Sequence, residues 1–578
     1  MLRSIALALA LVVAAPALEG RAQQSLYPTD ACVATKLDAA AIYCGKSMQS
    51  AAFGGSARLA PARQRLTDAW TNAEATSSEA GVSCAETTAT AAEMIAAIDA
   101  AAAEVSAEIT ASTVGSRGCE QRRQLLAAQA CQVLLTQEAN HLRNRSTDRT
   151  REELEAAQAQ LTAKVATRLT DGGTCAGSPD AEQVVAFANR AADAARFAAY
   201  VSPRVPSEWT MVTPDAQVPY NGKTLEPICS RGTPWVFFVK RGTVNKTLMY
   251  YQGGGACWSH TTCTFPTYKV SAGPSDNPAN ATTGFADFTN PENPFRDWNA
   301  VFVPYCTGDI HWGDSVYEHR QGGLKVTIHH KGYVNAQVAE KWAREHFANP
   351  DQVFVTGSSA GAYGAIMNSL PLQEYVWPSS DFAVLGDAGN GVITQDFQQN
   401  DLPKWGVEQN LPSWIPDLNV PITALDASKL WSISALFYPH NRFANYSSSF
   451  DGGTGGQTGF YNVMLNLDNP LSWLNWWPPS CEWNAIMREY VHASAAAAPN
   501  YRYYIGSGSR HTMWGSNKVY SDTTGNVPRI VDWVDAMLDE TPAWVNVESD
   551  DPGLLLPGDP RPNPPEYPYT EDGRVVCE

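Results

Sequence analysis

One serine stands in a local sequence typical of an activated nucleophile. Ser359 lies between Gly357 and Gly361, after the apolar residues 353–355 and before a small-residue stretch at 360–366. An apolar strand that turns sharply into a helix exposes such a serine at the turn, and glycine on both sides permits the close packing there. A glycine-rich loop without chemistry is the alternative. The strand pattern before the serine and the helix pattern after it favour a nucleophile.

A second glycine run fits the needs of a nucleophilic serine. The attack of a serine on a carbonyl carbon creates an oxyanion, which backbone N–H groups stabilise. The predicted strand 248–251 runs directly into glycines 253–255, where absent side chains let a substrate approach the backbone. We assign the amides of Gly254, Gly255 and Ala360 to this oxyanion hole. A phosphate-binding loop is disfavoured because neither a helical pattern nor a lysine follows the glycines directly.

The proton acceptor for the serine is expected late in the chain. In folds with this serine turn, the nucleophile is followed by an acid and then by a histidine. Of the ten histidines, His511 follows a predicted strand at 501–505 through a loop of glycine and serine, so it lies at the carboxyl end of a strand. His329 and His330 precede the serine and, as neighbours in a strand, would point to opposite faces. We therefore predict that His511 is the base.

Several segments resemble the pectin acetylesterase/Notum family and occur in the family's order. They are YQGGGACW at 251–258 with Cys263, PYCTGD at 304–309, GSSAGA at 357–362 and RHT at 510–512. The resemblance, to a bacterial-type member, covers roughly residues 220–545 and excludes the first 200. It implies an α/β-hydrolase fold, a Ser-Asp-His triad, no cofactor, and removal of acyl groups from carbohydrate or lipidated protein.

Two aspartates compete for the role of orienting His511. Asp451 ends a strand-like segment at 442–450, and the family's acid stands at such a strand end in an aromatic-Asp pair followed shortly by Gln. Here Gln457 is displaced from that pair by a glycine-rich insertion, which lacks the carboxylates of a calcium loop. Asp387 also resembles a family segment but follows the serine closely. We predict that Asp451 is the triad acid and that Asp387 supports the floor of the site.

Tryptophans are candidates for contact with substrate. Exposed aromatic rings can stack on sugars or hold an acyl chain. The oxyanion loop, the segment 307–314 and the tryptophan-rich segment 473–483 supply Trp258, Trp312, Trp476 and Trp477 as predicted substrate-binding residues. The alternative is that these rings pack in the core or in a lid, and nothing in the sequence tells which way they face.

The elements that position these residues belong to two halves of different composition. Residues 23–200 are rich in Ala, have apolar residues at helical spacing and break near 115–118, 145–148 and 171–174, which predicts an all-α bundle of long antiparallel helices. Residues 201–547 alternate β-rich runs with helical patterns, which predicts an α/β-hydrolase domain with a mostly parallel sheet flanked by helices. Its predicted strands are 235–240, 247–252, 300–305, 352–356, 382–385, 442–446 and 501–505.

The two ends of the chain carry further signals. A basic start at Arg3, an apolar run at 5–15 and small residues up to Ala22 predict a secretory signal peptide at 1–22. An uncleaved anchor is disfavoured because the run is shorter than the ~20 residues that a span requires. The acidic, Pro-rich tail at 548–578 is expected to be an extended strap tied down through Cys577.

Cysteine usage fits an exported protein. The chain has 12 cysteines, six before residue 200 and six after it, which predicts disulfides within each half. Cys257 and Cys263 flank a short loop beside the oxyanion glycines and are expected to pair. The family supports Cys229 with Cys306, which leaves Cys481 with Cys577. Structural zinc is disfavoured because no CxxC pair exists.

Charge and composition limit the functions that remain. The 578 residues carry 41 Lys and Arg against 59 Asp and Glu, a formal net charge of −18, with 44% hydrophobic residues. The composition excludes intrinsic disorder, and the missing basic cluster disfavours nucleic acid. We expect a secreted serine carboxylesterase, extracellular or periplasmic, without metal or cofactor, which acts on small or polymeric esters with short acyl groups. A polyester depolymerase or lipase, and a non-catalytic binding protein, are the alternatives. The partner of the helical half is unknown.

Overall fold

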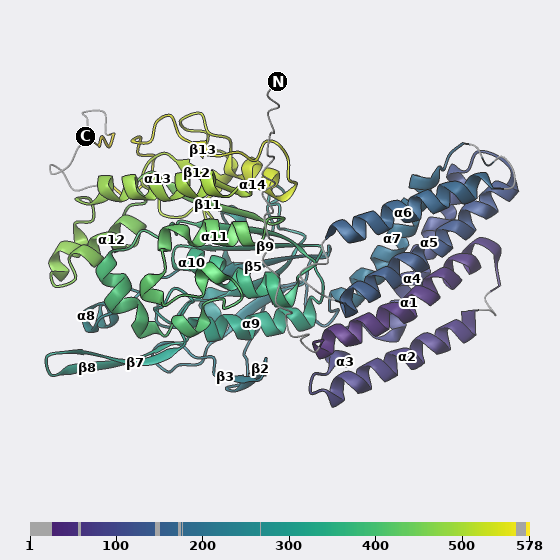
Figure 1. Cartoon of the computed structure of the whole chain (residues 1–578), viewed down its shortest axis with the longest axis horizontal. Helices are drawn as coiled ribbons and strands as arrows, with labels where there is room; N and C mark the ends of the chain where they lie inside the picture. Colours follow the sequence, from purple (N-terminus) through teal and green to yellow (C-terminus); the bar gives the residue numbers. More distant parts are fainter. Residues whose placement is uncertain are drawn as a thin grey trace, which may run out of the picture.

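The computed structural model describes residues 26–55, 59–144, 151–171, 175, 177–265, 267–561 and 574–577. Figure 1 shows two parts, a bundle of long helices and a sheet with helices on its faces. The predicted signal peptide at 1–22 lies outside the described residues. Within the described ranges, no helix is both long and apolar enough to cross a membrane.

The helices of the bundle all precede residue 201. They are α1 (Pro28–Phe53), α2 (Leu59–Glu79), α3 (Cys84–Thr87), α4 (Ala91–Ser112), α5 (Arg117–Arg143), α6 (Arg151–Thr170) and α7 (Ala181–Tyr200). Alanine favours helix, and its small side chain lets neighbouring helices approach closely. At Gly45 on α1, an added Cβ would lie only 3.2 Å from the carbonyl oxygen of Ala128 on α5. Thr90 and Glu93 form a capping box that begins α4.

A nine-stranded sheet forms the centre of the second part. Its order is β1-β4-β6-β5-β9-β10-β11-β12-β13, and the strands from β6 to β13 in this order pair in parallel. β4 pairs antiparallel with β6, and β1 with β4. The bounds are β1 (Thr210–Val212), β4 (Phe237–Lys240), β5 (Lys246–Tyr251), β6 (Asn299–Val303), β9 (Gln352–Ser358), β10 (Asp381–Asp387), β11 (Arg442–Ser448), β12 (Tyr501–Gly506) and β13 (Val547–Glu548).

Helices and two hairpins surround this sheet. The helices are α8 (His260–Thr264), α9 (Gly332–His346), α10 (Ala360–Pro371), α11 (Leu430–Phe437), α12 (Gln457–Leu465), α13 (Ser480–Ala497) and α14 (Ile530–Leu538). The hairpins are β2 (Val218–Tyr220) with β3 (Lys223–Leu225), and β7 (Ser315–Gln321) with β8 (Leu324–His330), the latter projecting from the molecule in Figure 1. Short helical turns fill much of the segment between 397 and 429.

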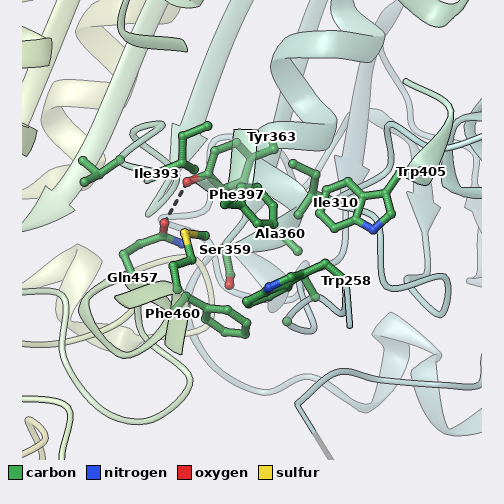
Figure 2. A pocket seen from close by; sticks show the side chains of 14 residues that line it. Trp258, Ile310, Ser359, Ala360, Tyr363, Ile393, Phe397, Trp405, Gln457 and Phe460 are labelled. Carbon is green, nitrogen blue, oxygen red and sulfur yellow. Dashed lines mark hydrogen bonds between the residues drawn. The ribbon is translucent and has the colours of Figure 1, made fainter. Parts of the chain in front are cut away.

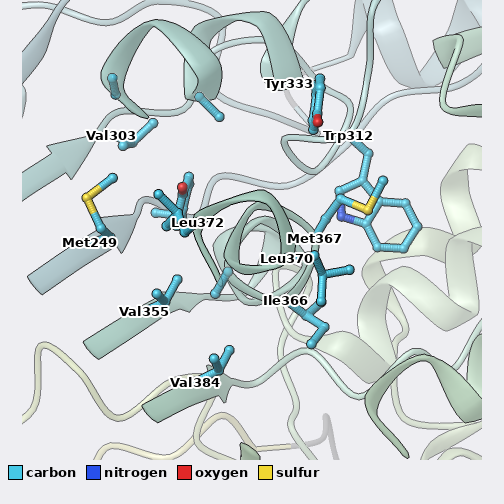
Figure 3. Close-up of a cluster of buried hydrophobic side chains, with 14 of the residues drawn as sticks. Met249, Val303, Trp312, Tyr333, Val355, Ile366, Met367, Leu370, Leu372 and Val384 are labelled. Atoms are coloured by element: carbon cyan, nitrogen blue, oxygen red, sulfur yellow. The ribbon is translucent and has the colours of Figure 1, made fainter. Parts of the chain in front are cut away.

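Both faces of the sheet are buried. Successive strand residues point to opposite faces, and each face packs against helices. On one face, Met249, Val303, Val355 and Val384 pack against α9 and α10, and Figure 3 shows Leu370 and Ile366 of α10 beside these strands. On the other face, Leu248, Phe354 and Leu385 pack against α14 and Trp514. This double burial explains why the central strands are apolar throughout.

The predicted fold class is confirmed. All seven strands expected from the sequence are present, each within two residues of its predicted bounds. The mostly parallel sheet is flanked by helices and preceded by an all-α bundle, whose last helix ends at Tyr200. The sequence missed β1, the two hairpins and β13, which are short or lie at the edges of the fold.

Six disulfides staple the two parts separately, as the cysteine count predicts. In the bundle they join Cys32 with Cys84, Cys44 with Cys131 and Cys119 with Cys175. In the α/β part they join Cys229 with Cys306, Cys257 with Cys263 and Cys481 with Cys577, the three expected pairs. No disulfide links the two parts in the described residues, so only noncovalent contacts and the chain itself connect them there.

The bundle docks on the carboxyl-terminal end of α9 through polar contacts. Arg344 forms a buried ion pair with Asp30 of α1 at 3.0 Å, and its guanidinium lies over the ring of Tyr27. The hydroxyl of Tyr27 donates to Glu345 at 2.6 Å. Removing one partner of a buried ion pair is costly only while the other stays buried. Loss of the whole bundle would expose Arg344 to water.

We predict that a chain starting at residue 201 folds by itself. The buried residues of both sheet-face clusters all lie after residue 200, and the three disulfides of this part are internal. Circular dichroism and thermal unfolding of the shortened chain, beside the full chain, measure this. A shortened chain that is insoluble or lacks a cooperative transition would show that the bundle is needed for folding.

Candidate active site

Ser359 occupies a strained turn between β9 and α10. Its φ of 57° and ψ of −123° lie where residues with a side chain are rarely found, and such strain persists where the surroundings enforce it. An added Cβ at Gly357 would lie 2.2 Å from the carbonyl oxygen of Gly361, and one at Gly361 would lie 1.9 Å from that of Tyr251. Both glycines of the motif are therefore required by close backbone contact.

His511 and Asp451 are in direct contact. The Nδ1 of His511 lies 2.6 Å from Oδ1 of Asp451, a carboxylate that is fully buried. The backbone N–H of Gln457 also donates to this oxygen at 3.0 Å, so the displaced Gln of the insertion supports the carboxylate through its main chain. Burial lowers the pKa of His511, but the charge and hydrogen bond of Asp451 outweigh it, and the pKa lies above its ordinary value.

The other nitrogen of His511 is available for proton transfer. Nε2 is buried and has no hydrogen-bond partner among the described residues, Ser359 included. Catalytic hydrogen bonds are often loose in proteins without bound substrate and tighten in the complex. With Nδ1 held by Asp451, the free Nε2 is the atom that can accept a proton.

Asp387 connects the serine turn to the histidine loop. Its carboxylate accepts hydrogen bonds from the hydroxyl of Ser358 at 2.6 Å and from the backbone of Met513 at 2.9 Å, and its carbonyl accepts from the N–H of Ser359 at 2.8 Å. Burial raises its pKa to about 6. Asp387 therefore braces the residues on either side of the site, while Asp451 contacts the imidazole.

An apolar pocket opens beside Ser359. Figure 2 shows the Ser359 oxygen at this pocket, with Trp258 and Phe460 beside it. The empty space amounts to about 490 Å³ including its opening to solvent. The lining residues are Gly255, Ala256, Trp258, Ile310, Ser359, Ala360, Tyr363, Val392, Ile393, Phe397, Trp405, Gln457, Phe460 and Met464. The lining suits an acyl chain better than a sugar.

The predicted oxyanion residues are placed differently from one another. Gly255 and Ala360 line the pocket together with Ser359, whereas Gly254 is not part of its lining. Gly253 approaches the serine so closely that an added Cβ would lie 2.4 Å from the carbonyl oxygen of Ser358. The Cys257–Cys263 disulfide follows directly and holds this loop. Gly255 and Ala360 therefore lie at the pocket beside Ser359, and Gly254 does not line it.

Of the four tryptophans predicted to bind substrate, the structure brings only Trp258 to the pocket. Trp312 is buried in the core and donates its Nε1–H to the carbonyl of Tyr363 at 2.7 Å. Trp476 and Trp477 stack on each other in a small cluster with Phe450. Trp312, Trp476 and Trp477 are therefore buried among other side chains, which matches the alternative that they pack in the core.

Most of the apolar lining was missed by the sequence reasoning. Tyr363 lies one helical turn after Ser359, a spacing that points to the same face of α10, and its hydroxyl donates to Gln457 at 2.8 Å. Phe397 and Trp405 come from the short helical turns after β10, which have no periodic pattern. Phe460 and Met464 recur at helical spacing on α12. Among these pocket residues, only those on α10 and α12 have a helical spacing in the sequence that could have indicated their place.

The described residues offer neither a metal-binding cluster nor a free thiol. They contain no group of three or more His, Cys, Asp or Glu arranged to hold a metal ion, and no free cysteine. His319 and His330 contact each other through their Nε2 atoms at 3.1 Å, and Nδ1 of His330 contacts the carbonyl of Thr307. Burial lowers the pKa of His330 to about 3 and that of His319 to about 4, and the ring of His330 lies against Trp405.

Comparison with known proteins finds relatives of this chain. A family model described as Pectinacetylesterase matches residues 220–412. The palmitoleoyl-protein carboxylesterase NOTUM of Homo sapiens is 26% identical over 188 residues, 30% of this chain and 36% of that protein. The inactive palmitoleoyl-protein carboxylesterase notum1b of Danio rerio is 34% identical over 120 residues, 20% of this chain and 80% of that protein.

Among solved structures, the Wnt deacylase Notum from Drosophila matches with a TM-score of 0.39 and 14% identity, over 57% of this chain and 93% of that one. The chain spans about a third of the length of the active NOTUM proteins that it matches. The family model and the inactive Danio relative, four-fifths of which is covered, establish the relationship. The chain belongs to the pectin acetylesterase/Notum family.

Proposed function

We propose that this protein is a secreted serine carboxylesterase in which Ser359, His511 and Asp451 form the catalytic triad. The observation that carries the proposal is the contact between the buried Asp451 carboxylate and Nδ1 of His511, with Nε2 left free. Ser359, directly after β9, lines an apolar pocket. Six disulfides and the signal-like residues 1–22 support export.

The residues divide the work as follows. Ser359 Oγ attacks the ester carbonyl carbon and passes its proton to Nε2 of His511, while Asp451 stabilises the imidazolium that forms. The amides of Gly255 and Ala360, with Gly254 as the further donor predicted from sequence, stabilise the oxyanion. His511 then protonates the departing alcohol. Water, deprotonated by His511, then attacks the acyl carbon, and His511 returns the proton to Ser359 Oγ as the acid leaves.

A non-catalytic binding protein is the rival from another class, and one relative is itself named as inactive. Against that rival, this chain retains the serine, the histidine and the acid in their expected order. The strained turn at Ser359 gives a further argument, because strain is retained where it serves a reaction.

The nucleophile can be tested by one substitution. We expect Ser359→Ala to lower kcat on p-nitrophenyl butyrate by about 10⁴ to 10⁶, because one missing triad member disables the unit. Ser112→Ala, the same change on α4 of the bundle, serves as the control. Fluorophosphonate labelling should be lost only in Ser359→Ala. More than a tenth of wild-type turnover in a folded Ser359→Ala protein would refute the assignment.

The pH dependence tests the histidine and its acid. His511 must be neutral to accept the serine proton, and Asp451 raises its pKa above the ordinary 6.5. Activity should therefore fall as the pH drops through a value above 6.5, seen as the acidic limb of kcat/KM. Asp451→Asn should move this limb to lower pH and lower kcat by about 10⁴. A limb that stays in place in Asp451→Asn would contradict the pairing.

The acyl group is expected to be short. Short acyl groups fit a small pocket, and each methylene that fits contributes only about 0.8 kcal/mol, so discrimination among short chains should be weak. We predict the highest kcat/KM for acetyl to butyryl p-nitrophenyl esters and a decline toward palmitate. Trp405→Ala, which widens the pocket, should move the optimum to longer chains. An unchanged optimum in a folded Trp405→Ala protein would mean that the acyl chain lies elsewhere.

A depolymerase of aliphatic polyesters, or a lipase, is the second candidate function. The observation that favours it is apolar surface near the pocket. Leu471 and Leu474 are 86% and 71% exposed, on the segment that follows α12 with its pocket residues Phe460 and Met464. A maximum at palmitate, or release of hydroxy acids from a solid polyester without release of acetate from an acetylated polysaccharide, would favour this function.

A further inference from the structure

The C-terminal strap, defined here as residues 551–560, packs against the loop that carries His511. It lies beyond residues 220–412 that match the family model. Two contacts anchor the strap and the residues that follow it. The Cys481–Cys577 disulfide ties the following segment to α13, and Leu554 bridges to Arg574. Residues 574–577, which follow the strap in the chain, are therefore attached both to α13 and to the strap itself.

Three hydrogen bonds join the strap to Gly508 and Ser509, which precede His511 in this loop. The backbone N–H of Ser509 donates to Oδ2 of Asp559 at 3.2 Å, and its hydroxyl donates to the carbonyl of Pro560 at 2.6 Å. The N–H of Gly508 donates to the carbonyl of Pro552 at 3.0 Å. The strap thus holds the main chain two residues before His511.

Asp559 is the centre of this contact. It is 6% exposed, and its Oδ2 also accepts from the N–H of Leu556 within the strap at 3.0 Å. An added Cβ at Gly508 would lie 2.2 Å from the same oxygen, and Gly508 has a φ of +80°, so the approach requires glycine. The carboxylate also faces the guanidinium of Arg510 at 3.6 Å, directly before His511.

The opposite side of the loop rests on the segment that carries Asp451. The N–H of Phe450 donates to the carbonyl of Gly508 at 2.9 Å, and the N–H of Gly452 donates to that of Ser509 at 2.8 Å. The loop is therefore clamped between two partners. One partner is the segment 450–452, which contains Asp451. The other is the strap, which binds the loop through Pro552, Asp559 and Pro560.

We propose that Asp559 is a positioning residue, which holds the main chain of Ser509 so that His511 stays aligned with Ser359 and Asp451. The inference rests on the proposed function, because it gives His511 the role of base. Misplacement of a catalytic group by about 1 Å can cost about 10²-fold in rate without any change in substrate binding. The contribution of Asp559 is the hydrogen bond to the Ser509 N–H, which an amide oxygen can also accept.

The test compares Asp559→Ala with Asp559→Asn in the full-length protein on p-nitrophenyl butyrate. We expect Asp559→Ala to lower kcat about 10- to 100-fold with KM within twofold of wild type, and to slow fluorophosphonate labelling by the same factor. Asp559→Asn should keep kcat within about threefold of wild type. The matched control is Asp550→Ala, an exposed aspartate that hydrogen-bonds to Asn526 instead of the loop, and it should leave kcat unchanged.

Asp559→Ser provides a second test if Asp559→Ala does not fold. Its hydroxyl lies one bond closer to the main chain than the carboxylate oxygens, so the bond to the Ser509 N–H is lost, and kcat should fall at least threefold at unchanged KM. Wild-type kcat in folded Asp559→Ala, a change in KM alone, or equal loss in the Asn and Ala variants would overturn the proposal. A wild-type protein without turnover dependent on Ser359 would instead overturn the proposed function, which separates the two failures.

Discussion

The parallel pairing of four neighbouring strands sets the positions of the groups at the candidate site. Ser359 follows β9, Asp387 ends β10, Asp451 follows β11 and His511 follows β12, and these strands are adjacent in that order. The register places Ser358 beside Asp387 and Ser448 beside Gly506. Since carboxyl ends of parallel strands share one edge, each strand delivers one group there. Loss of this register would separate all four together.

The sequence was informative where local constraints decide the structure. The strained turn demands glycines around Ser359, and chain order then selects His511. The choice of Asp451 over Asp387 needed the family, because Asp387 ends β10 and Asp451 follows β11 closely, so both lie at the carboxyl ends of strands. In the structure it is the side chain of Asp451 that contacts His511, whereas that of Asp387 contacts the main chain of Met513. The central strands were predictable because burial on both faces makes them apolar throughout.

The features that the sequence did not reveal depend on contacts between distant segments. The docking of the bundle rests on Asp30 and Arg344, more than 300 residues apart, and neither residue has a local pattern that indicates a partner. The pocket residues Phe397 and Trp405 come from short turns without periodicity. Trp476 and Trp477 resembled binding residues only because a tryptophan-rich run looks the same whether its rings face solvent or, as here, a small buried cluster.

Because the strap is synthesised late, its contacts with the loop form only after the rest of the sheet has been made. Residues 551–577 leave the ribosome after every strand of the sheet, and the Cys481–Cys577 bridge can close only in an oxidising compartment. Until residues 552–560 have been made, the loop before His511 has only its contacts with Phe450 and Gly452. Under the roles proposed for Ser359, Asp451 and His511, a chain whose strap has not yet bound the loop would hydrolyse esters poorly.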